Sequence, residues 1–542
     1  MKLMPTTRFG VVWRGLVAFV VVVGCAAGAT ATAGLLQLKG VAEDFSQEAA
    51  LKGVKVQLPA PGKPETLFLI GVDHRYGQGD GVGNTDTMML VHINDKSSTI
   101  NLLSVPRDLE VNIPGVGISK LNAAYADGGP NLLLRTIRQQ VFPGFHVNHI
   151  LVIDFAGFAK LINEIGCVYA DVDHRYYNYN DGTIGTDFSN IDIQPGYQKM
   201  CGGGGSNLGG ANTALAFVRF RHNDSDIVRE SRQQDFLRWA KQDFSTSQLA
   251  SDEQTLLKTF GANVQTDPSL HKLDGIDELF ALAINANGST IKSIPFPYGP
   301  GVVVGGADDL SFSETASAHA YRQFMTPTVA PPAGTTTTTT TTHTTTYGKS
   351  GKSGKPSKKR RGKKHAPAPP TVPAGLRADP GDGRSQAGQL GRTGFPVYYP
   401  DYVPDDYEYC FAITGDCSEG YAASVYAKSY PRRYKIDGDD GKKHAAYVMT
   451  LVYGTPGTQG DLGTGEYFTV QGTTWQYPPI LRSGAVVKRV RGKLLAEYSQ
   501  GGKLAVVAWH TKKAVYWISN TLQNTIPNGQ MVEIAASFKR AP

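Results

Sequence analysis

Short apolar runs separated by turn residues characterise the first part of the chain. TLFLIGV, TMMLVHI and TINLLSV follow one another between residues 66 and 105, and each is typical of a buried strand. Apolar residues then recur at a helical period over Pro130–Val141. A further strand, ILVIDF, precedes the helical pattern AGFAKLINEIG, which ends at Gly166. Strands that alternate with helices predict an α/β domain whose central sheet is covered on both faces.

Arginines mark the next two predicted elements. Residues Ala214–Arg221 read as a strand in which Arg219 and Arg221 point to one face. The following segment, IVRESRQQDFLRWAKQDF, has the pattern of an amphipathic helix, and Arg229 and Arg232 continue its buried stripe near the amino end. Backbone N–H groups and the helix dipole favour an anion there. We therefore expect these four arginines to converge on an anion.

Charged residues also stand at the ends of the predicted strands. The strand NLLSV runs directly into Pro106-Arg107-Asp108, and ligands of open α/β sheets bind at the carboxyl ends of strands. Asp73 and Asp86 supply carboxylate oxygens, which suit Mg2+, and arginine forks match phosphate oxygens. Taken singly, each residue is more often a cap or an ion pair than a ligand. Together they predict a pyrophosphate site.

Five blocks of sequence, in a fixed order, carry a resemblance to a known family. The blocks are GVDHR, TDTMMLV, SVPRD, SKLNAAYADGG, and FVRFRH followed by RESRQQ. They resemble the LytR-CpsA-Psr family of cell-wall phosphotransferases over residues 64–325. The resemblance implies a three-layer α-β-α domain with a central mixed sheet.

The resemblance also implies roles for individual residues. Asp73 and Asp86 would hold Mg2+, with Mn2+ as a possible substitute. The pyrophosphate of a polyprenyl-linked glycan would be bound by Arg75, Arg107, Arg219, Arg221 and one or both of Arg229 and Arg232. Arg107, Arg219, Arg221 and Asp86 would form the catalytic set.

Four further positions refine this assignment. Asp108 is expected to orient Arg107 rather than to meet the metal, and Lys120 to support the same segment. The sequence departs from the family pattern at Thr85, where a serine is usual, and at Val111, where the family often has a basic residue. Thr85 keeps the hydroxyl group.

The function that the resemblance implies is transfer of a glycopolymer from a polyprenyl-pyrophosphate carrier to a peptidoglycan hydroxyl. The enzyme would be a phosphotransferase of cell-wall assembly, with polyprenyl phosphate as the leaving group. Hydrolysis of the pyrophosphate is one alternative, and a non-catalytic protein that binds the wall or the lipid carrier is another. No nucleic-acid partner is expected, because the basic residues would lie outside the cell.

The amino-terminal segment predicts a membrane protein. Residues 1–14 are basic and residues 15–36 are uncharged, a length that spans a bilayer. We expect a cytoplasmic amino terminus, a single-pass anchor over 15–36 in the cell membrane, a connector over 37–63, and the bulk of the chain outside the cytoplasm. A cleaved signal peptide is the alternative, and the residues before Cys25 loosely resemble a lipoprotein cleavage site.

The four cysteines after the anchor fall as one pair in each predicted domain. In an oxidising exterior this spacing favours two disulfides, Cys167 with Cys201 and Cys410 with Cys417. Metal binding is the rival interpretation, but no CxxC motif or histidine pair accompanies them.

Composition changes sharply after the first domain. Residues 326–394 contain a threonine run, a basic tract and segments rich in proline and glycine, which predict a disordered linker. Residues 395–542 are dense in aromatics and contain the strand-like runs AAYVMTLVYG, KLAVVAWH and AVYWISN. They predict a carboxyl-terminal α+β domain with an antiparallel sheet and without a recognisable catalytic motif.

Overall fold

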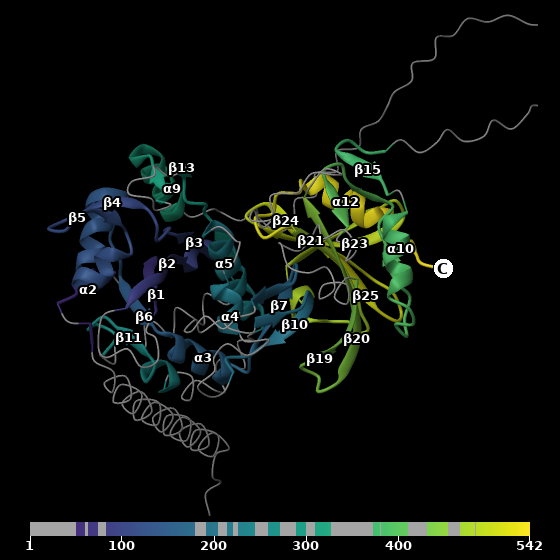
Figure 1. Ribbon diagram of the computed structural model, residues 1–542, viewed down its shortest axis with the longest axis horizontal. Helices are drawn as coiled ribbons and strands as arrows, with labels where there is room; N and C mark the ends of the chain where they lie inside the picture. Colours follow the sequence, from purple (N-terminus) through teal and green to yellow (C-terminus); the bar gives the residue numbers. More distant parts are fainter. Residues whose placement is uncertain are drawn as a thin grey trace, which may run out of the picture.

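The structure consists of an amino-terminal α/β body and a β-rich carboxyl-terminal module beside it (Figure 1). The computed structural model describes residues 50–51, 53–59, 63–73, 83–178, 191–203, 214–220, 226–243, 258–271, 289–299, 309–326, 372–379, 381–409, 431–453, 467–482 and 484–542. The predicted anchor over 15–36 lies outside these residues. Within the described ranges no helix combines the length and apolar character needed to cross a membrane.

A six-stranded mixed sheet forms the centre of the amino-terminal body. Its order is β11-β6-β1-β2-β3-β12. The strands are β1 (Glu65–Asp73), β2 (Asn84–Asn94), β3 (Thr99–Ser104), β6 (His149–Ile153), β11 (Val264–Thr266) and β12 (Thr290–Ser293). β1, β2 and β3 pair antiparallel, whereas β6 is parallel to β1 and β12 is parallel to β3. The predicted α/β fold with a central mixed sheet is confirmed, and the apolar runs form β1, β2, β3 and β6.

Apolar clusters cover both faces of this sheet and make three layers. One cluster packs Phe68, Ile70 and Leu90 of the sheet against α2 (Ala123–Thr136), the π-helical turn η2 (Ile137–Val141) and α9 (Glu314–Met325). The other cluster joins Leu67 and Val91 to the side of α3 (Phe155–Glu164) and α5 (Asp226–Asp243). Smaller elements complete the body: η1 (Asp95–Ser97), the hairpin β4 (Glu110–Ile113) and β5 (Gly117–Lys120), β13 (Tyr298–Gly299) and β14 (Ser311–Phe312).

A separate hairpin extends from this body toward the module. It consists of β7 (Val168–Val172) and β10 (Gly196–Met200), which pair antiparallel, and the short strands β8 (Tyr176–Asn178) and β9 (Ile191–Ile193) lie between them in sequence. The predicted disulfide joins Cys167 to Cys201 across the ends of the hairpin, with a Cα–Cα distance of 4.4 Å. The predicted partner pair, Cys410 and Cys417, lies outside the described residues.

The prediction of a strand over Ala214–Arg221 is wrong. Residues Ala214–Arg219 form the short helix α4. All five residues from Ala214 to Val218 are buried in the cluster that α4 shares with Phe236 and Trp239 of α5. Such a continuously buried apolar run carries no periodicity that separates a helix from a strand.

The carboxyl-terminal module is built on one antiparallel sheet. Seven strands follow the order β18-β20-β21-β25-β24-β23-β22, and β19 pairs with β20. Their bounds are β18 (Tyr407–Tyr409), β19 (Arg432–Asp437), β20 (Lys443–Tyr453), β21 (Tyr467–Thr473), β22 (Ala485–Val490), β23 (Lys493–Gln500), β24 (Lys503–His510) and β25 (Val515–Ser519). The module also contains α12 (Asn528–Ser537), η3 (Pro479–Leu481), β16 (Tyr398–Tyr399), β17 (Tyr402–Pro404) and β26 (Lys539–Arg540).

The module begins earlier than the sequence predicted. Residues 376–378 form β15 (Leu376–Ala378) and residues 382–389 form α10 (Asp382–Gln389). Leu376, Ala387 and Leu390 belong to the module's main apolar cluster. The linker predicted over 326–394 is therefore too long at its carboxyl end, because three apolar residues anchor a segment whose composition is otherwise polar.

Candidate active site

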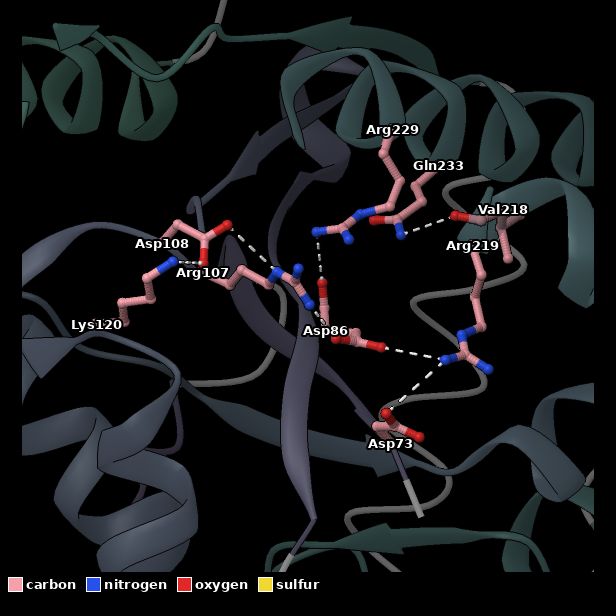
Figure 2. A network of polar contacts seen from close by, with 9 residues as sticks. All are labelled: Asp73, Asp86, Arg107, Asp108, Lys120, Val218, Arg219, Arg229 and Gln233. Atoms are coloured by element: carbon pink, nitrogen blue, oxygen red, sulfur yellow. Dashed lines mark hydrogen bonds and ion pairs between the residues drawn. The ribbon is translucent and has the colours of Figure 1, made fainter. Parts of the chain in front are cut away.

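The predicted acidic pair lies at the carboxyl end of β1 and the amino end of β2, two central strands of the sheet. Asp73 is the last residue of β1 and pairs with Asn84, so Asp86 stands only two residues into the neighbouring strand β2. Because the two strands are antiparallel neighbours, the end of one meets the beginning of the other. The side chains of Asp73 and Asp86 are 15% and 16% exposed, and Figure 2 shows them facing the same space.

Arg219 connects the two carboxylates. Its Nη2 atom lies 3.8 Å from Asp73 Oδ2 and 3.5 Å from Asp86 Oδ2 (Figure 2). The guanidinium group rests on the ring of Phe155, 3.5 Å from the ring centroid, at the first residue of α3. This stacking holds the cation in position while leaving its edge directed at the carboxylates. No motif marked Phe155 as part of the site.

Arg107 approaches Asp86 from another side. It follows β3, and its Nη1 atom lies 2.5 Å from Asp86 Oδ1. Asp108 Oδ2 lies 3.5 Å from Arg107 Nε, and Lys120 Nζ lies 2.9 Å from Asp108 Oδ1. Lys120 therefore holds Asp108, and Asp108 holds Arg107, as predicted for these residues.

Lys120 remains charged in this network. Desolvation by itself lowers the pKa of Lys120, but the hydrogen bond and negative charge of Asp108, together with Asp309, raise it above the ordinary value. Asp309 Oδ1 lies 3.5 Å from Lys120 Nζ. The positive charge of Lys120 attracts one oxygen of Asp108, and the other oxygen of Asp108 faces Arg107.

The structure separates the two arginines of α5. Arg229 Nη2 donates to the backbone oxygen of Asp86 over 3.2 Å, which brings this side chain into the site. Arg232 is fully buried, donates from Nη1 to the backbone oxygen of Phe220 over 2.7 Å, and lies 4.4 Å from the ring centroid of Tyr176. Arg229 therefore lies beside Asp86, whereas Arg232 binds the loop after α4 from inside the core.

Polar side chains fix α5 to its neighbours. Gln233 Nε2 donates to the backbone oxygen of Val218 over 3.1 Å, and Gln234 Nε2 donates to Ser104 Oγ over 2.8 Å. The first contact ties α5 to α4, which carries Arg219, and the second ties it to β3, which leads to Arg107. These two glutamines, which end the block RESRQQ but were given no role from the sequence, thus hold α4 and β3 to α5.

Two predicted site residues, Arg75 and Arg221, lie outside the described residues. Of the remaining set, Asp73, Asp86, Arg107, Arg219 and Arg229 are brought together (Figure 2). Thr85, the residue before Asp86, is fully buried. Its position on the strand directs it away from the polar face that Asp86 joins.

The two carboxylates fit the magnesium ion that the family pattern implies. Among the described residues no group of three or more metal-binding side chains gathers in one place. Mg2+ commonly takes one or two protein carboxylates and completes its shell with substrate phosphate and water. Asp73 and Asp86, linked by one guanidinium nitrogen, supply that number of hard oxygen donors.

A three-layer α/β domain with paired carboxylates and converging guanidinium groups defines an anion site suited to phosphate groups. A family model described as "LytR_cpsA_psr family" matches residues 35–323. This chain belongs to that family, as its sequence blocks predicted.

Two of the relatives that the chain matches are teichoic acid transferases by name. The chain is 28% identical over 248 residues to "Polyisoprenyl-teichoic acid--peptidoglycan teichoic acid transferase TagU" of Oceanobacillus iheyensis, covering 42% of this chain and 69% of the relative. It is 29% identical over 269 residues to the corresponding TagT of Bacillus subtilis, covering 48% of this chain and 78% of the relative. A solved structure titled "LytR-CPS2A-psr family protein YwtF (TagT) with bound octaprenyl pyrophosphate lipid" aligns with a TM-score of 0.36 at 20% identity, over 51% of this chain and 98% of that one.

Proposed function

We propose that this chain transfers a glycopolymer from a polyprenyl-pyrophosphate carrier to a peptidoglycan hydroxyl, forming a phosphodiester bond. The observation that carries the proposal is the position of Asp86, whose carboxylate contacts Arg107 and Arg219 and whose backbone oxygen contacts Arg229. Family membership supports it, and so do the relatives named as polyisoprenyl-teichoic acid transferases.

The arginines supply the electrostatic part of the reaction. The acceptor hydroxyl oxygen attacks the phosphorus next to the glycan, and the bond from that phosphorus to the bridging oxygen breaks. Polyprenyl phosphate leaves with the bonding electrons, and the hydroxyl proton ends on the leaving phosphate or in solvent. Arg107, Arg219 and Arg229 stabilise the negative charge that moves onto the bridging oxygen, because guanidinium forks bind phosphate oxygens bidentately.

Asp73 and Asp86 have two tasks in this proposal. They hold the arginines in position before substrate binds, since their oxygens lie within 2.5 to 3.8 Å of guanidinium nitrogens. Mg2+, or Mn2+ in its place, would be held by the same two carboxylates and would add positive charge at the pyrophosphate.

The place of action follows from the substrates. A lipid-linked donor is confined to the cell membrane, and peptidoglycan lies outside that membrane. A site that acts on both must therefore stand at the external face of the cell membrane. The uncharged stretch over residues 15–36 would anchor the chain there. We propose a single-pass cell-membrane protein with residues 37–542 outside the cytoplasm.

A transfer assay with the purified full-length chain in detergent tests the proposal. A synthetic polyprenyl-pyrophosphate glycan is incubated with peptidoglycan, with Mg2+ or with EDTA, and linked glycan is quantified. We expect metal-dependent product that is lost in Asp86→Asn and kept in Asp406→Asn, an exposed aspartate of the module. Release of free glycan phosphate without linkage would show a hydrolase instead. Lipid binding without either product would show a carrier-binding protein.

A further inference from the structure

The module and the amino-terminal body share a buried apolar cluster. Tyr169 of β7 and Tyr197 of β10 pack in one cluster with Trp475, Trp517 and Ile480 of the module. Tyr169 and Trp475 meet edge to face at 5.2 Å, and Tyr197 and Trp517 do so at 6.0 Å. Tyr197 and Trp517 are 1% and 0% exposed, so this contact excludes water as a protein core does.

Buried hydrogen bonds accompany this apolar contact. Both carboxylate oxygens of Asp171 in β7 accept from the module, one from Gln471 Nε2 and the other from Ser519 Oγ. Gln471 Oε1 in turn accepts from the backbone nitrogen of Tyr197 over 2.9 Å. Thr450 Oγ1 donates to the backbone oxygen of Asp173 over 2.9 Å. These bonds join β20, β21 and β25 of the module to both strands of the hairpin and to the residue that follows β7, which fixes the register of docking.

The docked hairpin supports the helix that carries Arg229. α5 packs against β7 and also against η3 of the module. At the carboxyl end of α5, Asp243 Oδ2 accepts from the backbone nitrogen of Tyr169 over 2.6 Å. The hydroxyl of the same tyrosine donates to the backbone oxygen of Asp437 in β19 over 2.6 Å. Tyr169 thus holds α5 with its backbone and the module with its side chain.

The far end of this helix enters the active site. A helix rises about 1.5 Å per residue, so Arg229 stands roughly 21 Å from the docked end at Asp243. A rigid helix carries a change of tilt at one end to the other. The module also lies beside the outer edge of the catalytic sheet, where β23 packs against β12, the neighbour of β3.

We propose that the carboxyl-terminal module, residues 372–542, is a positioning part of the active site rather than a separately tethered domain. Docked on β7 and β10, it holds α5 in the orientation that places Arg229 against Asp86. The inference rests on the proposed function for its effect on turnover. Its effect on docking and on α5 is independent of that function.

Cleavage of the connecting segment provides the first test. A specific protease site is inserted after Thr346 in the full-length chain, and the chain is cut at that site. We expect the two fragments to elute together in size-exclusion chromatography and to keep the transfer rate of the uncut chain. Separation of the fragments with the rate unchanged would overturn the proposal.

A single substitution in the contact provides the second test. Gln471→Glu places a second carboxylate against Asp171 without touching the site, and Gln389→Glu makes the same chemical change on the exposed end of α10. In Gln471→Glu we expect the cut fragments to separate, and kcat of the uncut chain to fall about tenfold to 100-fold because Arg229 is displaced. Gln389→Glu should match the wild type. Ser519→Ala, which removes one donor without adding charge, should give a smaller change in the same direction.

Hydrogen exchange separates this inference from the proposed function. In Gln471→Glu the backbone amides of α5 should exchange at least about tenfold faster, corresponding to a loss of about 1.4 kcal/mol in local stability, while those of β1 and β2 stay unchanged. If the wild type proved inactive but α5 responded in this way, only the proposed function would fail. If the amides of α5 exchanged at the same rate in Gln471→Glu and in Gln389→Glu, the module would have no positioning role, whatever the activity.

Discussion

Arg107 Nη1 lies 2.5 Å from Asp86 Oδ1, and the other oxygen of the same carboxylate lies 3.5 Å from Arg219 Nη2. One carboxylate therefore holds two guanidinium groups that reach it from different elements. Without it, the two cations would repel each other across a partly buried space. Asp86 thus arranges the arginines before a phosphate group arrives.

Removing the charge of Asp86 should impair both turnover and stability. We expect Asp86→Asn to lower the transfer rate by about 100-fold or more, the scale observed when one group of a preorganised charge site is lost. The variant should also melt at a lower temperature, because the arginines keep their charge and lose their common partner. Thermal unfolding with and without inorganic pyrophosphate checks this explanation. Pyrophosphate should raise the melting temperature of the variant more than that of the wild type.

Much of the catalytic body could be predicted from sequence because the relevant signals are local. The runs that become β1, β2 and β3 are mostly apolar, and Asp73, Asp86 and Arg107 stand at or close to their ends. Ala214–Arg219 was assigned to the wrong element because every residue up to Val218 is buried. Without a polar position in that run, its sequence carries no period.

Other features depend on contacts between distant residues. Arg229 and Arg232 lie three positions apart on one helix, so the sequence cannot tell which one faces Asp86 and which one faces Tyr176. Asp171 and Gln471 are 300 residues apart, and neither belongs to a motif. Docking of the module could therefore not be inferred from the sequence.

The two arginines of α5 should respond differently to substitution. Arg229→Ala is expected to weaken donor binding about tenfold or more while leaving the free energy of unfolding within about 1 kcal/mol, since the side chain reaches the site. Arg232→Met should lower the free energy of unfolding by about 3 kcal/mol, because the backbone oxygen of Phe220 and the nearby charge of Asp173 lose a buried cation. Urea unfolding and KM for the donor separate the two roles. If Arg232→Met instead raised KM for the donor and kept the free energy of unfolding of the wild type, Arg232 would be the arginine that binds the donor.

The disulfide between Cys167 and Cys201 should stabilise the hairpin on which the module docks. It closes a loop with a sequence separation of 34, for which loss of the bond costs about 2 to 4 kcal/mol. We expect Cys167→Ala with Cys201→Ala to lower the urea midpoint accordingly. The variant also tests the second predicted disulfide. If Cys410 and Cys417 are bonded, dithiothreitol will lower the midpoint of the variant further, and if they are not, it will leave the midpoint unchanged.

Stability should depend on pH through the buried carboxyl of Asp171. Burial is the main cause that raises its pKa to about 6, and the nearby charge of Asp173 adds to it, although hydrogen bonds from Ser519 and Gln471 act in the opposite direction. A carboxyl group whose pKa is higher in the folded than in the unfolded chain destabilises the fold once it ionises. The penalty is absent below the unfolded pKa of 3.8, grows as the pH rises from there to about 6 because the unfolded chain loses the proton first, and is complete above about 6.

Asp171→Asn isolates this contribution. The amide can accept from Gln471 through its oxygen and donate to Ser519 Oγ through its nitrogen, so both contacts with the module persist without the charge. Relative to the wild type, we expect the variant to gain up to about 3 kcal/mol in free energy of unfolding at pH 8 and almost nothing at pH 4. Urea unfolding at a series of pH values measures this difference. If the difference in free energy of unfolding between the variant and the wild type were the same at pH 4 and pH 8, Asp171 would stay in one protonation state throughout. Its contacts with Gln471 and Ser519 would then be its only contribution to docking.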